Sequence, residues 1–90
     1  MPNANPTTDT TGITAIAFRE TVERLNADGE LTAKQRVAVL LRTADPAPTT
    51  WEDIARILSH TRPAGPCSVR TARTHYQRGV EKIIQAMEGR

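Results

Sequence analysis

The chain has 90 residues, a formal charge of +2 and only three aromatic side chains, Phe18, Trp51 and Tyr76. A chain of this length forms one small domain and buries about 60 to 65% of the surface that its unfolded form exposes, which leaves little room for an enclosed active site. The single cysteine excludes an internal disulfide, and the two histidines have no second cysteine to complete a zinc site.

The N-terminal third begins with a polar segment. Residues 1–12, MPNANPTTDTTG, offer no apolar anchor, so they predict a disordered leader ahead of one folded domain over residues 13–90. From Ile13 onward apolar residues recur at helical spacing, which predicts a first helix that Asn26 to Gly29 ends. The apolar residues at this spacing are Ala15, Phe18, Val22 and Leu25.

Two further helices each begin at a threonine. Thr32 and Gln35 form a T-x-x-Q capping box, and Thr50 and Asp53 form a T-x-x-D box. The second helix is expected to end at Asp45, because a residue before proline avoids the helical region. The third is short, about two and a half turns. The buried stripe expected on the second helix is Val37, Leu40, Leu41 and Ala44. The third helix carries the apolar residues Ile54, Ala55, Ile57 and Leu58, and its core stripe is expected to be Trp51, Ile54 and Leu58.

The last predicted helix runs from about Ser68 to Met87. Two prolines and a glycine between Ser59 and Cys67 interrupt the helical pattern, and Ser68 is a favourable N-cap. Gly79 inside the helix costs about 1 kcal/mol relative to Ala, which predicts a close contact with another helix there. The expected buried stripe is Ala72, Tyr76, Val80, Ile83 and Met87. With a core of Leu, Ile, Val and Ala, the sequence therefore predicts an all-α, four-helix compact domain.

Charge is unevenly distributed along the chain. Residues 1–61 hold six basic and eight acidic residues, a balance of −2, whereas residues 62–90 hold six basic and two acidic residues, a balance of +4. The last third is therefore the part that attracts a polyanion. A short anchored helix, a turn and a basic helix follow one another as in a helix-turn-helix unit, whose second helix enters the major groove of DNA. This order predicts a DNA-binding helix-turn-helix at the C-terminus.

The residue types at the start of the last helix suit base recognition. Arginine pairs bidentately with guanine, threonine offers a hydroxyl or a methyl group to thymine, and no carboxylate lies between Arg62 and Val80. Arg78 and Lys82 lie further along, where phosphate contacts are expected. The predicted DNA contacts are Thr50, Trp51, Arg62, Ser68, Arg70, Thr71, Arg73, Thr74, Gln77 and Arg78.

Two nearby side chains are expected to have structural roles. His75 falls next to the buried stripe of the last helix and is predicted to be a half-buried packing residue. Cys67 precedes the N-cap and is predicted to be a turn residue, since no catalytic base is identifiable near it.

The segment LTAKQRVAVLLRTADPAPTTWEDIARIL resembles the start of region 4 of bacterial sigma factors, and SVRTARTHYQRGVEKI is similar to the recognition helix that follows it. The resemblance covers roughly Ile13 to Met87 and implies a helix-turn-helix domain that binds double-stranded DNA. The nine residues between Leu58 and Ser68 form a longer connection than is usual in that family, and they carry Arg62. Because no second sigma-factor domain is present in this chain, the resemblance implies a free-standing small regulator.

Other functions are weighed against DNA binding. An adaptor that docks on RNA polymerase or another transcription factor is the alternative, and a large exposed apolar patch would mark it. No enzyme activity, metal or cofactor is expected, since the sequence lacks paired carboxylates, a glycine-rich phosphate loop and metal-ligand spacing. A homodimer that pairs through Ile84, Met87 or the first helix is a further alternative. The chain has no membrane span and no signal peptide, so a cytoplasmic location is expected.

Overall fold

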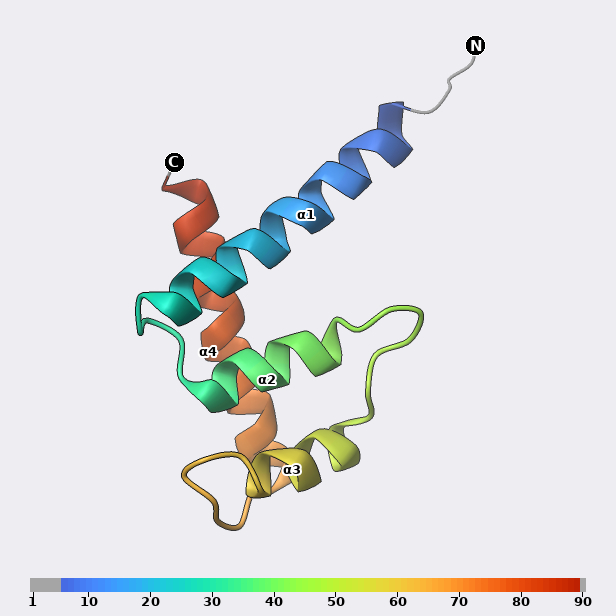
Figure 1. Cartoon of the computed structure of the whole chain (residues 1–90). Coiled ribbons are helices and arrows are strands. Elements are labelled where there is room, and N and C mark those ends of the chain that lie inside the picture. The colour runs from blue at the N-terminus through green and yellow to red at the C-terminus, as the bar shows by residue number, and fades with distance from the viewer. Residues whose placement is uncertain (1–5, 90) are drawn as a thin grey trace.

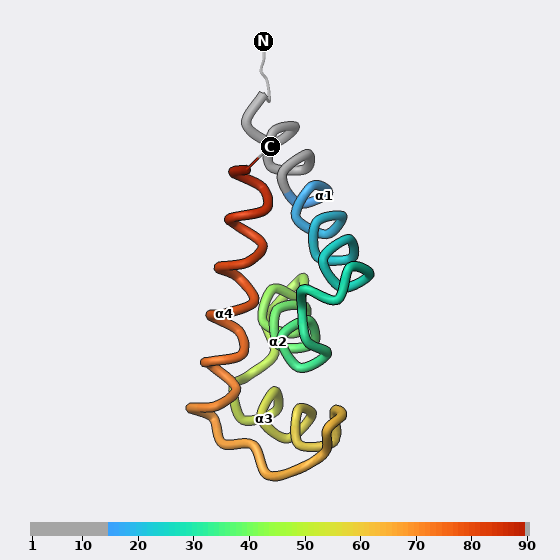
Figure 2. The backbone as a smooth tube through the Cα atoms, turned by 90° about the vertical axis from the view of Figure 1, so that its left-hand side faces the viewer, coloured from blue at the N-terminus to red at the C-terminus, as the bar shows by residue number. Residues whose placement is uncertain are grey.

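The computed structural model describes residues 6–89, with side chains from Ala15 onward, and this part of the chain contains four helices and no strand. Helix α1 spans Pro6–Ala27, α2 spans Ala33–Arg42, α3 spans Trp51–Ser59 and α4 spans Val69–Glu88 (Figure 1). Helices α2 and α3 lie across α4, which runs along one side of the domain and contacts each of the other helices (Figure 2). The predicted all-α, four-helix fold is confirmed.

Helix α1 begins earlier than the sequence pattern indicated, at Pro6 and not at Ile13. Of the expected leader, residues 1–5 lie outside the described residues and residues 6–12 belong to α1. Proline suits the first position of a helix, because its missing N–H would have no partner there. The other end lies where expected: Gly29 adopts a φ of 77°, and the Glu30 amide donates to the Leu25 carbonyl at 2.9 Å.

The two threonine caps differ in how completely they form. At Thr32 the box is complete, because its hydroxyl accepts from the Gln35 amide at 3.0 Å and the Gln35 Oε1 accepts from the Thr32 amide at 3.1 Å. At Thr50 only the first half forms, with the Asp53 amide donating to the hydroxyl at 3.2 Å. The Asp53 carboxylate instead accepts from Arg56 at 2.8 Å. An aspartate is one methylene shorter than the glutamate that usually reaches back in such a box.

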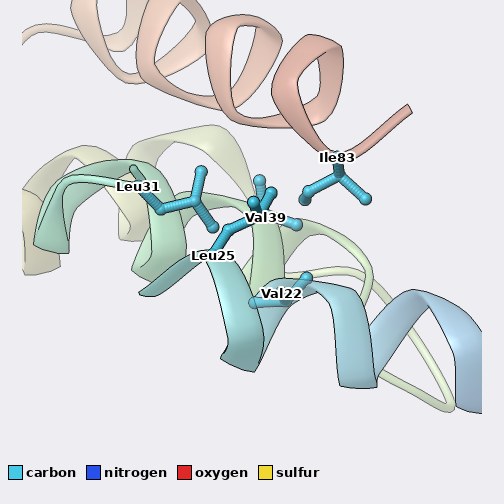
Figure 3. Packing of buried hydrophobic residues seen from close by; sticks show 5 residues of the cluster. All are labelled: Val22, Leu25, Leu31, Val39 and Ile83. Atoms are coloured by element: carbon cyan, nitrogen blue, oxygen red, sulfur yellow. The ribbon is translucent and has the colours of Figure 1, made fainter. Parts of the chain in front are cut away.

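The core consists of two clusters that share α4. One lies between α1, α2 and α4 (Figure 3), and the other lies between α2, α3 and α4. Tyr76 packs against both, so the position of α4 is fixed relative to α3 as well as to α1. The buried residues of the first cluster are Val22, Leu25, Leu31, Val39 and Ile83, and those of the second are Ala38, Ile54, Ala55, Leu58 and Ala72.

The predicted stripe of α4 packs against the core, with Ala72 and Ile83 buried and Tyr76, Val80 and Met87 half-buried, and the predictions for α2 and α3 are only partly correct. On α2 the buried residues are Gln35, Ala38 and Val39, whereas the expected stripe residues are only half-buried. The three buried residues share one face at i, i+3, i+4 spacing, and the expected stripe lies on the opposite face, which the neighbouring helices cover only in part. On α3, Ile54 and Leu58 are buried as expected and Trp51 is half-buried, while Ile57 is 37% exposed.

The crossing of α2 and α4 depends on the absence of a side chain at Gly79. A Cβ atom at this residue would lie 2.8 Å from the Cγ2 atom of Val39 and 3.4 Å from the Cβ atom of Gln35. The close helix contact predicted from this glycine is therefore confirmed.

Lys82 forms hydrogen bonds at the same crossing. Its Nζ atom donates to the Glu30 carbonyl at 2.7 Å and to Gln35 Oε1 at 3.0 Å. The rotation of α4 on α2 directs this side chain to the loop between α1 and α2, and the phosphate contact expected of Lys82 stays a prediction.

Replacing Lys82 with Met should lower the free energy of unfolding by about 1 kcal/mol, since Gln35 and Glu30 each lose a donor. Urea denaturation followed by circular dichroism measures this change. Glu81→Gln, on the exposed face of the same turn, should leave stability within about 0.5 kcal/mol of the wild type. Equal stabilities for Lys82→Met and Glu81→Gln would show that the Lys82 contacts contribute nothing.

Candidate nucleic-acid interface

The first half of α4 presents a continuous polar face. Ala72 and Tyr76 hold one side of the helix against α2 and α3. The opposite side is uncovered by any other described helix, because α4 lies at the edge of the domain (Figure 2). Helical spacing places the predicted contacts on or beside that uncovered side. The residues exposed there are Arg70, Thr71, Thr74, Gln77 and Arg78.

Hydroxyl groups order the first two turns of α4. The Ser68 hydroxyl accepts from the Thr71 amide at 3.1 Å and donates to the Thr71 hydroxyl at 3.1 Å, so Ser68 is the N-cap of the helix. The Thr74 hydroxyl donates to the Arg70 carbonyl at 3.1 Å. Ser68, predicted as a DNA contact, thus has its hydroxyl engaged by the cap. The two threonines keep lone pairs and methyl groups that can meet a ligand.

Three arginines of α4 are exposed and carry no ion pair among the described residues. The two ion pairs in that part of the chain join Arg36 to Glu23 at 3.0 Å and Arg56 to Asp53 at 2.8 Å. The guanidinium groups of α4 are therefore available to a polyanion without first breaking a salt bridge. These arginines are Arg70, Arg73 and Arg78.

Trp51 is the centre of an aromatic and cationic cluster at the start of α3. Its ring meets the Tyr76 ring edge-on, with centroids 5.4 Å apart and an interplanar angle of 79°. The Cζ atoms of Arg42 and Arg73 lie 4.6 Å and 5.4 Å from the centroid of the indole ring. Trp51, predicted as a DNA contact, is half-buried and packs against the second core cluster. Arg73 is exposed as expected, yet its guanidinium leans toward α3.

Arg42 is the functional candidate that the sequence analysis missed. Besides stacking on Trp51, its Nη1 atom donates to the Thr49 carbonyl at 3.0 Å and so ties the connection between α2 and α3 to α2. Nothing in the sequence marks this arginine apart from its place at the end of the second helix, because its partners come from α3 and from the connection before it.

Thr50 contributes to the start of α3 through its cap. Its side chain is exposed, but its hydroxyl accepts the Asp53 amide, and Glu52 and Asp53 supply negative charge to the first turn. These carboxylates already complement the positive end of the helix dipole. A phosphate at this turn would therefore meet two negative charges, which makes Thr50 a weaker candidate than the residues of α4.

The connection between α3 and α4 is a closed loop with Arg62 exposed on it. The Gly65 amide donates to the Ser59 carbonyl at 3.0 Å, and the Thr61 hydroxyl donates to the Ile57 carbonyl at 3.0 Å. The loop passes the free end of α3 and leads into the first turn of α4 (Figures 1 and 2). Arg62 therefore lies at the end of the domain where α4 begins.

The two side chains expected to have structural roles are both half-buried. Cys67 lies in the loop before α4 and packs against the second core cluster. His75 lies beside the buried face of α4. Burial lowers the pKa of His75 below its ordinary value of 6.5, and the positive charges of Lys34 and Arg78 lower the pKa further. Lys34 thus extends the basic surface from α4 onto α2.

The pKa of His75 predicts a loss of stability in acid. The folded pKa lies below the unfolded value of 6.5, so the unfolded state binds more protons as the pH falls. The stabilisation is complete above the unfolded pKa and is lost as the pH falls through the folded pKa. Urea denaturation from pH 7.5 to pH 5 should therefore show a steeper decline for the wild type than for His75→Gln. Parallel declines for the two proteins would contradict this.

The described residues contain no group of three or more His, Cys, Asp or Glu side chains arranged to hold a metal ion. No helix in this described part of the chain is long and apolar enough to cross a membrane. In comparisons with known proteins, no family model, no curated protein and no solved structure matches the chain. A functional assignment therefore depends on the residues and their geometry.

Proposed function

We propose that this protein is a transcriptional regulator that binds double-stranded DNA at specific sequences, with the first turns of α4 in the major groove. The observation that carries the proposal is the polar face of the first half of α4, residues 69–78, which has no carboxylate and which the core holds away from the other helices. A major groove about 12 Å wide admits one α-helix. The exposed side chains of α4 are of the types that pair with base edges and phosphates.

The residues of this face divide into two roles. Arg70 and Gln77 lie on the outward side and suit hydrogen bonds to base edges, and Thr71 and Thr74 add methyl and hydroxyl contacts. Arg78 lies at the flank of the helix, where a phosphate contact is expected. Arg62, on the loop before α4, is a further phosphate contact, because it is exposed at the end of the domain where α4 begins.

The order of helices supports the resemblance to region 4 of sigma factors, since a capped second helix, a short third helix and a basic fourth helix follow one another. On this basis RNA polymerase or a partner regulator is a possible protein partner. Many helix-turn-helix proteins read two half-sites as dimers, and a homodimer would fit that mode of binding.

The adaptor alternative receives no comparable support. A docking surface would require a contiguous apolar patch. The exposed large apolar side chains of the described residues are Ile16, Ile57 and Ile84, one on each of three helices. Ile57 on α3 lies at the end of the domain opposite to the described part of α1 (Figure 2), so the three do not form one patch.

A titration of labelled duplex DNA at increasing salt tests the proposal. The logarithm of the binding constant should fall linearly with the logarithm of the salt concentration, with a slope of about −0.9 for each phosphate contacted. Arg24→Ala, which removes one exposed charge from α1, is the matched control and should bind like the wild type. The absence of duplex binding at 50 mM salt would contradict the proposal.

A further inference from the structure

We infer that Arg42 and Arg73 form a phosphate clamp, assembled on the ring of Trp51, that binds one phosphodiester of the DNA backbone beside the major groove. The inference rests on the proposed function and adds to it a backbone contact made by two different helices. It also assigns a role to Arg42, a residue of α2 that lies outside the basic helix.

Three helices meet at this point. Arg42 is the last residue of α2, Trp51 is the first residue of α3 and Arg73 lies in the second turn of α4. Both guanidinium groups lie over or beside the same indole ring, at 4.6 Å and 5.4 Å from its centroid. The Tyr76 ring packs against the edge of Trp51 and holds it in place. Residues of α2 and α4 therefore contact one indole ring of α3, and two of them carry a guanidinium group.

Two positive charges that both contact the Trp51 ring favour the binding of an anion. Neither arginine belongs to an ion pair of the described residues, where the pairs are Arg36 with Glu23 and Arg56 with Asp53. Of the five N–H donors of Arg42, a single hydrogen bond, from Nη1 to the Thr49 carbonyl, is formed. The remaining donors of both groups are available. A planar guanidinium pairs bidentately with the oxygens of a phosphate.

The placement of the clamp favours a backbone phosphate and not a base. Arg73 leans from α4 toward α3, away from the outward side that carries Arg70. In helix-turn-helix proteins the first helix of the unit crosses the DNA backbone while the second lies in the groove. Here the clamp lies at the start of that first helix, α3, so the strand at the edge of the groove is its natural ligand.

Affinity measurements separate this clamp from base recognition. Arg42→Gln and Arg73→Ala should each weaken binding by about five- to tenfold on every duplex sequence, and each should reduce the magnitude of the salt slope by about 0.9. Arg24→Ala is again the control. Arg73 is exposed, so Arg73→Ala should keep the wild-type melting temperature. If Arg42→Gln proves unstable, Arg73→Ala alone tests the clamp. Wild-type affinity and salt slope in Arg73→Ala would overturn the clamp.

The fluorescence of Trp51, the single tryptophan of the chain, gives an independent measurement. Adding duplex DNA should change the emission of the wild type, and adding inorganic phosphate against chloride of equal ionic strength should produce a smaller change of the same kind. Both responses should be lost in Arg73→Ala. A duplex that binds without changing the emission would overturn the clamp while leaving the proposed function intact. A phosphate response without any duplex binding would overturn the DNA assignment instead.

Discussion

Arg70→Ala should lower the affinity for the preferred duplex by about 10- to 100-fold, because a bidentate arginine–guanine pair discriminates between bases by about 1–3 kcal/mol. Affinity for unrelated duplex should change only a few-fold, since nonspecific binding depends on the total positive charge. Arg70 is exposed on α4, and its carbonyl, not its side chain, accepts the bond from Thr74. The substitution should therefore leave the fold unchanged.

Two variants separate base recognition at Arg70 from its charge. Arg70→Lys keeps the charge but lacks the planar fork, so it should retain nonspecific affinity and lose most of the discrimination. Arg73→Ala should show the opposite pattern, with an equal loss on all sequences. Competition binding with preferred and scrambled duplexes measures both effects. Equal losses on the two duplexes in Arg70→Ala would show that Arg70 contacts phosphate and not a base.

Gly79→Ala should destabilise the domain by about 1–3 kcal/mol, although alanine favours a helix over glycine by about 1 kcal/mol. The added Cβ would lie 2.8 Å from Val39 Cγ2, and Val39 is fully buried, β-branched and stiff. The helices must therefore separate. Gly65→Ala is the control, because nothing lies within 4 Å of a Cβ at that residue.

Combining Gly79→Ala with Val39→Ala tests the cause of this effect. The Val39 variant alone leaves a cavity, but in the double variant the new methyl group fills part of it. The double variant should therefore be at least about 1 kcal/mol more stable than the sum of the single effects predicts. Urea denaturation measures all four proteins. Strict additivity would show that the α2–α4 crossing is not limited by this contact. Because the crossing fixes α4, Gly79→Ala should also weaken DNA binding without altering any contact residue.

The parts of the fold that the sequence predicts correctly depend on local chemistry. The caps at Thr32 and Ser68 and the buried stripe of α4 follow from side chains within one or two turns of each other. Gly79 makes a long-range contact with α2. Glycine is unfavourable inside a helix, so its presence in the sequence already indicated a close crossing of two helices. The start of α1 was missed, because a run of polar residues gives no apolar period to follow.

The missed features of the interface depend on how the helices are rotated against one another. Lys82 and Arg73 both lie on a basic helix, but one reaches the Glu30 carbonyl and the other leans toward Trp51. Arg42 became a candidate only when α3 and α4 placed an indole and a second arginine beside it. Periodicity gives the face of a helix but not the neighbour that the face meets.

Selection of bound sequences from a random duplex pool is the most direct test of the assignment of α4 as a recognition helix. The wild type should enrich a defined motif that contains guanine, and Arg70→Ala should lose the preference at one position while Arg73→Ala keeps the motif with weaker binding. A pool that stays random after repeated rounds with the wild type would contradict the account.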